Sequence, residues 1–119
     1  MTMGITALKL VEGVTEDVTI LEAYGRLDST TAKEFSDRLI GLLQAGRSAI
    51  VVDLKNIAYI SSAGFRVLLI ANQAATEKAS KLALCGVIGE IRRLFELGAF
   101  TERFLICQTQ ADGIVQLKQ

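Results

Sequence analysis

The order of apolar runs and amphipathic segments predicts an α/β fold with the element order β-β-α-β-α-β-α-β-α. Two short alternating segments open the chain on either side of a polar turn, which favours an antiparallel hairpin. Strand-like and helix-like segments then alternate, as in parallel strands joined by right-handed crossovers. The runs Ala49–Val52 and Phe104–Cys107 are apolar throughout, which is typical of buried parallel strands. We therefore expect a mixed sheet of about five strands, with about four helices mainly on one face.

Each element has its own local signal. The expected strands are 5–11, 18–24, 49–53, 81–86 and 103–107, and the hairpin loop is 12–17. The expected helices are 32–43, 63–78 and 88–98, with a last helix after a cap at 109–112. Thr31 to Glu34 has the capping-box pattern, and Gly46 ends that helical segment. The polar segment Asp53–Asn56 interrupts the apolar run and predicts a turn.

Length and charge restrict the classes of function. The chain has 119 residues, which suits a single domain over 1–119. Lys plus Arg and Asp plus Glu both number 13, so the net charge of zero gives no basic field for nucleic acid or a membrane surface. We see no signal peptide and no apolar run long enough to span a bilayer, and expect a cytoplasmic protein. Cys85 and Cys107 lie in apolar runs, so we expect buried, reduced thiols.

The residue inventory argues against an enzyme. The sequence contains no histidine, which excludes a Ser-His acyl-transfer site. It shows neither a metal-ligand cluster nor a glycine-rich phosphate motif. Asp28 and Asp53 could meet at the strand ends as a carboxylate pair, but carboxylates at such places more often cap turns or orient serines. We expect a binding protein without a cofactor.

The segment around Ser61 and Ser62 is the most informative part of the sequence. It follows an apolar strand and precedes a helix that is apolar almost all round in its first half. Ser62 stands where an N-cap is expected, and an isolated serine pair at such a place is most often a plain cap. A small domain cannot easily surround a helix of this kind, so we expect a partner-facing area near Gly64, Phe65 and Arg66.

The segment from Val51 to Leu69 resembles the signature of the STAS domain in the branch of anti-sigma factor antagonists. That family has a strand, an apolar pair and then Asp-Ser-[Ser/Thr]-Gly-Leu opening a helix. Gly64 fixes the frame, so the family's phosphorylated serine corresponds to Ser62. Ser61 replaces the family's acidic residue and is a rival site, while Ala63 occupies the second hydroxyl position.

Two further segments extend the resemblance from about Val18 to the end of the chain. The family carries Gly-x-Leu-Asp where this chain has Gly25 to Asp28, which implies that Asp28 lies beside the phosphorylated serine. The family's third-helix pattern is similar to Ile91–Gly98, with one residue fewer before the glycine.

The resemblance implies a binding switch. The unphosphorylated protein would bind an anti-sigma factor with serine-kinase activity and so release a sigma factor. Phosphorylation of Ser62 would end the association, and a serine phosphatase would restore it.

Two alternatives stay open at this point. STAS domains also serve as accessory subunits of membrane transport systems, where the same surface would bind a transporter ATPase and Ser62 would be only a cap. Nucleotide binding by the domain itself is a third reading, without a phosphate cradle in the sequence to support it.

Overall fold

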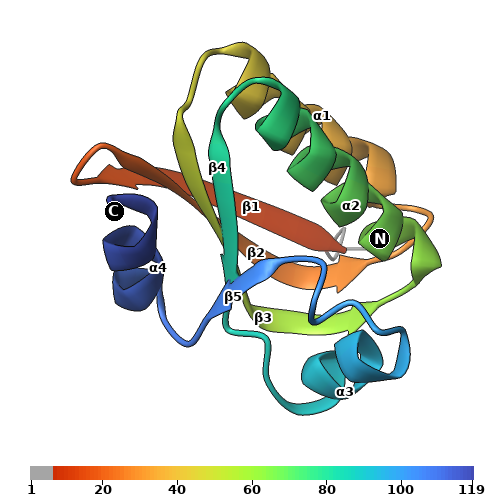
Figure 1. The fold of residues 1–119 in the computed structure, drawn as a ribbon. Helices are drawn as coiled ribbons and strands as arrows, with labels where there is room; N and C mark the ends of the chain where they lie inside the picture. Colours follow the sequence, from red (N-terminus) through yellow and green to blue (C-terminus); the bar gives the residue numbers. More distant parts are fainter. Residues whose placement is uncertain (1–6) are drawn as a thin grey trace.

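A computed structural model describes residues 7–119, in which the five strands form one mixed sheet in the order β1-β2-β3-β4-β5 (Figure 1). The strands are β1 (Leu8–Thr15), β2 (Val18–Leu27), β3 (Ala49–Ile60), β4 (Lys81–Cys85) and β5 (Leu105–Cys107). The helices are α1 (Ala32–Gln44), α2 (Ser62–Glu77), α3 (Gly89–Leu97) and α4 (Gln110–Leu117). β1 pairs with β2 antiparallel, and all other neighbours are parallel. The predicted fold class and element order are confirmed.

The opening hairpin has a tighter turn than the sequence suggested. β1 and β2 stay paired as far as Thr15 and Val18, so only Glu16 and Asp17 remain between them. Both have positive φ, 52° and 69°, which is the backbone of a type I′ turn and matches the twist of the strands. The predicted six-residue loop is therefore wrong. Residues 5 and 6 of the first expected strand lie outside the described residues.

The prediction of a turn at Asp53–Asn56 is also wrong, because β3 continues through it to Ile60. β2 is long enough to pair with this extension, and the register shifts between Glu22 and Tyr24 and between Gly25 and Arg26. At the first irregularity the Asp53 carboxylate accepts a hydrogen bond from the Lys55 amide at 2.9 Å. The polar residues thus lie in an irregular, still-paired strand rather than in a loop.

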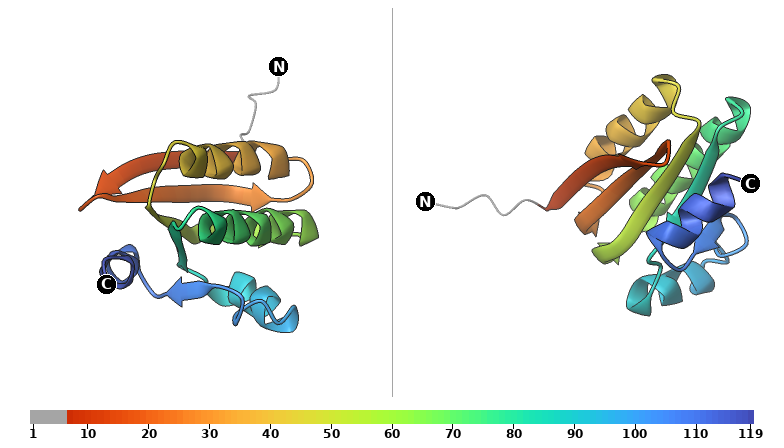
Figure 2. Two further views of the ribbon diagram at one scale, coloured as in Figure 1. Left: turned by 45° about the horizontal axis from the view of Figure 1, so that its top comes forward. Right: turned by 90° about the vertical axis from the view of Figure 1, so that its left-hand side faces the viewer.

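Two apolar layers cover the sheet. Alternate side chains of β2, β3 and β4 pack against α1, α2 and α3 in the larger core, which includes Phe35, Leu68 and Phe95. The other face carries a smaller cluster with Val51 and Ala83, covered by Ile114 and Leu117 of α4. Figure 2 shows α1 and α2 side by side, and the chain's last helix apart from them. Three helices on one face and one on the other agree with the expected arrangement.

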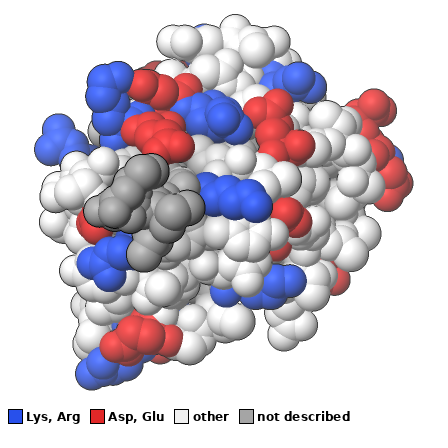
Figure 3. All heavy atoms as spheres, turned by 180° about the vertical axis from the view of Figure 1, so that it is seen from behind, with Lys and Arg blue, Asp and Glu red and all other residues white. Residues whose placement is uncertain are grey.

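Charged side chains of both signs are interspersed on the face drawn in Figure 3, without a broad field of one sign there. Within residues 7–119, no helix has the length and apolar character needed to cross a membrane.

Candidate functional site

The C-terminal ends of β2 and β3 meet where α2 begins. Leu27 and Ile60 are the last paired residues of the two strands. The ladder continues for one more bond, because the Ser61 amide donates to the Leu27 carbonyl at 2.9 Å. Asp28 directly follows Leu27, so the backbone brings the predicted serines and Asp28 to the same end of the sheet.

The two serines differ in environment. Ser61 is the N-cap residue of α2, with φ −101° and ψ 178°, and its side chain makes no capping hydrogen bond. Its hydroxyl oxygen is buried without a hydrogen-bond partner among the described residues. Ser62 is the first helical residue and is exposed.

The prediction that Ser62 is the N-cap is therefore wrong by one position. The physical reason is the bond from the Ser61 amide to Leu27, which keeps Ser61 in the extended conformation of β3. The helix can only start at the following residue, and this leaves Ser62 exposed in the first turn of α2.

Gly64 explains how α2 approaches the strand ends so closely. A Cβ on Gly64 would lie 2.8 Å from the Leu27 carbonyl oxygen and 2.8 Å from Cγ1 of Ile60. Real Cβ atoms do not tolerate such contacts, so any side chain here would move the helix start. Gly64 thus fixes the position of Ser62 relative to β2 and β3. Ala63, its half-buried neighbour, separates the glycine from the serine.

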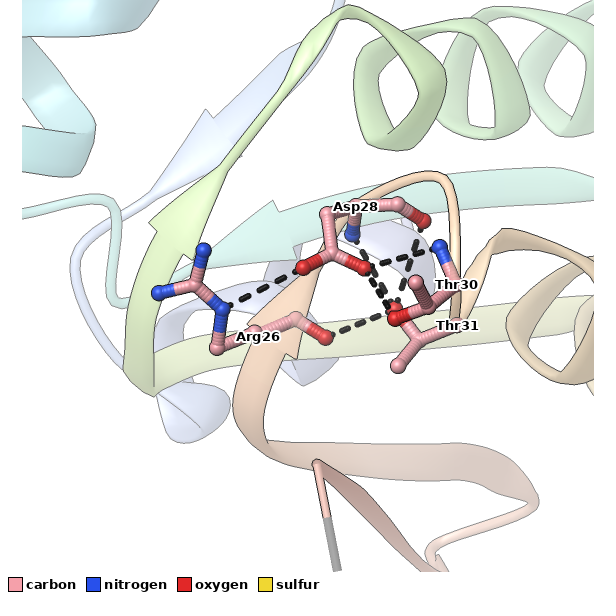
Figure 4. Close-up of polar contacts among 4 residues, drawn as sticks. All are labelled: Arg26, Asp28, Thr30 and Thr31. Carbon is pink, nitrogen blue, oxygen red and sulfur yellow. Dashed lines mark hydrogen bonds and ion pairs between the residues drawn. The ribbon is translucent and has the colours of Figure 1, made fainter.

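Asp28 organises the loop between β2 and α1 (Figure 4). One carboxylate oxygen accepts from the Thr30 amide at 2.9 Å and from its hydroxyl at 2.6 Å, and the other pairs with Arg26 at 3.2 Å. The hydrogen bonds from Thr30, followed by the Arg26 guanidinium, hold the pKa of Asp28 below its usual value. The hydrogen bonds of this carboxylate within residues 7–119 go to Thr30 and Arg26, and the action of Asp28 on Ser62 stays a prediction.

Thr31 closes the same loop. It is the N-cap residue of α1, but its side chain makes no capping hydrogen bond, so the predicted capping box is wrong. Its buried hydroxyl instead donates to the Arg26 carbonyl at 2.8 Å and accepts from the Asp28 amide at 3.0 Å. These two hydrogen bonds tie the start of α1 to the end of β2. Arg26 also stacks on the ring of Tyr59, with its guanidinium carbon 4.6 Å from the ring centre.

A groove of about 540 Å³ opens beside the two serines, between the start of α2, the end of β3 and α3. Its lining includes Phe65, Phe100, Leu69, Leu94, Leu97, Tyr59, Ser61, Ser62 and Arg66. Phe65 is only 7% exposed, and its ring stacks on Phe100 at 4.4 Å between centroids, so Phe65 belongs to the floor. Leu97 is 70% exposed at the rim. The groove is therefore an aromatic-floored apolar surface next to the candidate switch.

A polar cluster on the other face of the sheet was missed from the sequence. Gln110 of α4 donates to Glu22 at 2.7 Å and to Asp53 at 2.8 Å. Glu22 and Asp53 are register partners on β2 and β3, so their carboxylates lie side by side. Asp53 therefore lies mid-strand and not with Asp28 at the strand ends. No sequence signal links Gln110 to Asp53 or to Glu22, which lie 57 and 88 positions earlier in the chain.

The two cysteines differ in burial. Cys85 is buried, as predicted, whereas Cys107 is only half-buried because β5 is a three-residue edge strand. Burial, together with the nearby Asp53 carboxylate, raises the pKa of the Cys85 thiol to about 12. Residues 7–119 contain no group of three His, Cys, Asp or Glu side chains placed to hold a metal ion.

Comparison with known proteins identifies the family. Residues 10–113 match the STAS domain. The chain belongs to the STAS domain family. Among curated relatives, the Bordetella bronchiseptica protein named "Putative anti-sigma factor antagonist BtrV" is 27% identical over 111 residues, covering 93% of this chain and 96% of the relative. The anti-sigma-B factor antagonist of Staphylococcus aureus is 33% identical over 73 residues, covering 61% of this chain and 68% of the relative. These relatives place this STAS domain in the anti-sigma factor antagonist branch.

Solved structures agree on the fold. An anti-sigma factor antagonist from Mycobacterium paratuberculosis has a TM-score of 0.81 at 17% identity, covering 94% of this chain and 95% of that one. The Bacillus protein SpoIIAA in its phosphorylated form has a TM-score of 0.69 at 17% identity, covering 92% and 98%. A sulfate transporter family protein from Wolinella succinogenes has a TM-score of 0.71 at 18% identity, covering 89% and 88%. The STAS fold is thus shared by antagonists and a transporter-family protein, and does not by itself separate the two roles.

Proposed function

We propose that this STAS protein is an anti-sigma factor antagonist switched by phosphorylation of Ser62. The observation that carries the proposal is the contrast between the neighbouring serines: the Ser62 hydroxyl is exposed beside an apolar groove, and the Ser61 hydroxyl is buried. A kinase reaches an exposed hydroxyl without disturbing the backbone, whereas Ser61 would first have to leave its position beside Leu27. Ser62 is therefore favoured over Ser61 as the modified residue.

In its unphosphorylated form the protein binds an anti-sigma factor with serine-kinase activity and thereby releases a sigma factor. Phe65 and Arg66 line the groove and belong to the partner-binding side of α2, with Phe65 acting from the groove floor. Gly64, which we also expected on this side, is buried against Leu27 and Ile60 and acts by setting the position of the helix start. The partner's kinase phosphorylates Ser62 and a serine phosphatase removes the phosphate. The protein itself performs no chemistry, works in the cytoplasm, and contacts neither nucleic acid nor membrane directly.

The phosphate acts through charge rather than through unfolding. It adds roughly −1.5 to −2 charge at the start of α2, where the helix dipole and free amides favour an anion. The domain should keep its fold. A partner surface that packs on the groove would have to desolvate the dianion, which costs several kcal/mol unless cations compensate. A loss of about 3 kcal/mol already weakens binding more than a hundredfold.

The transporter-subunit alternative has weaker support. The likeness to the Wolinella protein concerns the fold alone, at 18% identity, whereas the two sequence relatives are named as antagonists. If the chain were such a subunit, it would co-purify with a transporter ATPase and would not require phosphate on Ser62.

Kinase treatment of three proteins tests the assignment of the switch. The wild type and Ser61→Ala should each gain one phosphate by intact mass, and Ser62→Ala should gain none. Because Ser62 is exposed and makes no cap, Ser62→Ala should unfold with nearly unchanged free energy, so the lost phosphate cannot be attributed to misfolding. Phosphate mapped to Ser61, with Ser62→Ala still modified, would refute the assignment.

A further inference from the structure

Arg66 is the single charged side chain in the lining of the groove beside Ser62. It is exposed, and within residues 7–119 it forms no ion pair, unlike Arg26, Arg38, Arg92 and Arg93, which each pair with a carboxylate. The other lining residues are apolar, aromatic or uncharged polar groups. An otherwise apolar groove therefore offers one free guanidinium at its rim.

Arg66 is also four residues after Ser62 on α2. Side chains at this spacing lie on one helix face, about 6 Å apart at Cβ, and an anion preceding a cation is the favoured order. Both residues line the same groove, which confirms that they share a face. A phosphate on Ser62 would carry three acceptor oxygens, and the planar guanidinium can donate two parallel hydrogen bonds to them.

We propose that the Arg66 guanidinium forms an ion pair with a carboxylate of the partner segment that binds in the groove. Phosphate on Ser62 then pairs with the same guanidinium in place of that carboxylate. The occupant is then a protein segment with apolar side chains over Phe65 and Phe100 and an Asp or Glu opposite Arg66. Charge complementarity selects an acid, because the groove lining holds no anion and the free amides at the start of α2 add positive potential. Phosphorylation therefore occupies the Arg66 guanidinium and also repels the partner's carboxylate. The inference rests on Ser62 as the modified residue.

A titration of the isolated protein tests the phosphate pair without a partner. Phosphoserine is introduced at position 62 during translation, and its second pKa is followed by ³¹P NMR in the wild type, Arg66→Gln and Arg66→Lys. The wild-type phosphate should have a pKa lower by about 0.3 unit or more than in Arg66→Gln, since the cation favours the dianion. Arg66→Lys should recover most of this difference.

The matched control is Arg47→Gln, which removes an equal charge from an exposed loop residue before β3, at the opposite end of that strand. The other charged groups near the strand end, Arg26 and Asp28, are the same in every variant. Equal phosphate pKa values in the wild type and Arg66→Gln would overturn the pair. No kinase is needed, so that result would leave the proposed switch intact, and a failure of kinase binding would not alter the titration.

Binding of the unmodified variants to the anti-sigma kinase tests the partner's carboxylate. Arg66→Gln should weaken binding about fivefold, as for loss of a rim ion pair, and Arg66→Glu should weaken it further by repulsion. Arg66→Lys and Arg47→Glu should bind nearly as the wild type does. If Arg66→Glu bound as tightly as the wild type, or more tightly, the partner would not present an acid to this position.

Discussion

Ser61 and Ser62 are adjacent in sequence, but Ser61 keeps the extended backbone that continues from β3, and Ser62 is the first residue of α2. A single hydrogen bond from the Ser61 amide to Leu27 decides which hydroxyl faces solvent. At the scale of one residue, this bond separates a buried, unpartnered oxygen from an accessible one. The proposed switch depends on that difference.

Asp28→Asn should slow phosphorylation of Ser62 while the domain stays folded. The amide can still accept from Thr30, but it loses the negative charge that, by our prediction, orients or deprotonates the Ser62 hydroxyl. The matched control is Asp37→Asn, which removes an exposed carboxylate paired with Lys33 on α1. Phosphorylation rates of both variants are compared with that of the wild type.

The free energy of unfolding at acid pH gives a second test of Asp28. The pKa of Asp28 is lowered in the folded state, so its contribution is present above the unfolded value near 3.8 and is lost as pH falls. Asp28→Asn should lack this part of the acid dependence. If its phosphorylation rate equals that of the wild type, Asp28 only shapes the loop.

Cys85 should react with a thiol reagent more slowly than Cys107 in the native protein. Cys85 is buried with a pKa of about 12, whereas Cys107 is half-buried on the edge strand. The unfolded chain loses the thiol proton near its ordinary pKa of 9.0, so the free energy of unfolding should fall as pH rises from 9.0 to about 12. Cys85→Ala should show a smaller fall, and labelling of Cys85 as fast as Cys107 would contradict its burial.

At the scale of elements, the position of α2 depends on contacts that only glycine allows. Gly64→Ala would place a methyl group 2.8 Å from the Leu27 carbonyl oxygen and 2.9 Å from Cβ of Leu27. We expect a loss of about 1–3 kcal/mol in the free energy of unfolding, as for overpacked core sites. Slower phosphorylation should accompany it, because the start of α2 must shift.

Gly41→Ala provides the matched control for chemical denaturation. Gly41 lies in α1, and no atom lies within 4 Å of an added Cβ. This variant should gain about 0.5–1 kcal/mol from helix propensity alone. A Gly64→Ala protein as stable as the wild type would show that α2 is not held against the strands by this contact.

The alternation of strands and helices could be predicted because each element has its own apolar period. The length of β3 could not, since the polar residues Asp53, Lys55 and Asn56 look like a turn until β2 is known to pair beside them. The N-cap prediction at Ser62 failed for the same reason. In both places a partner distant in sequence overrides the local signal.

In the whole molecule, the two faces of the sheet differ in the size of their apolar core and in the helices that cover them. The face under α1, α2 and α3 carries the larger core and the candidate site, while α4 closes the other face through a small apolar cluster. Gln110 ties α4 to β2 and β3 through two carboxylates. The placement of Ser62 and Gly64 at the start of α2 could be predicted from the motif spacing. The tie through Gln110 joins three elements and leaves no pattern in the sequence.

Gln110→Ala should destabilise the fold by about 1–2 kcal/mol and leave phosphorylation of Ser62 unchanged. Its loss deprives Asp53, which is 5% exposed, and Glu22 of their shared donor. Chemical denaturation and the kinase assay measure the two effects. An altered rate at Ser62 in a protein that is still folded would show that the two faces are coupled.

Phosphate on Ser62 is proposed to control binding without changing the fold. The most direct test is calorimetric titration of the anti-sigma kinase with unmodified protein and with protein carrying phosphoserine at position 62. Circular dichroism should show the two forms equally folded. The unmodified form should bind at least a hundredfold more tightly, in line with a desolvation penalty of about 3 kcal/mol or more. Equal affinities for the two folded forms would show that phosphate on Ser62 does not control binding.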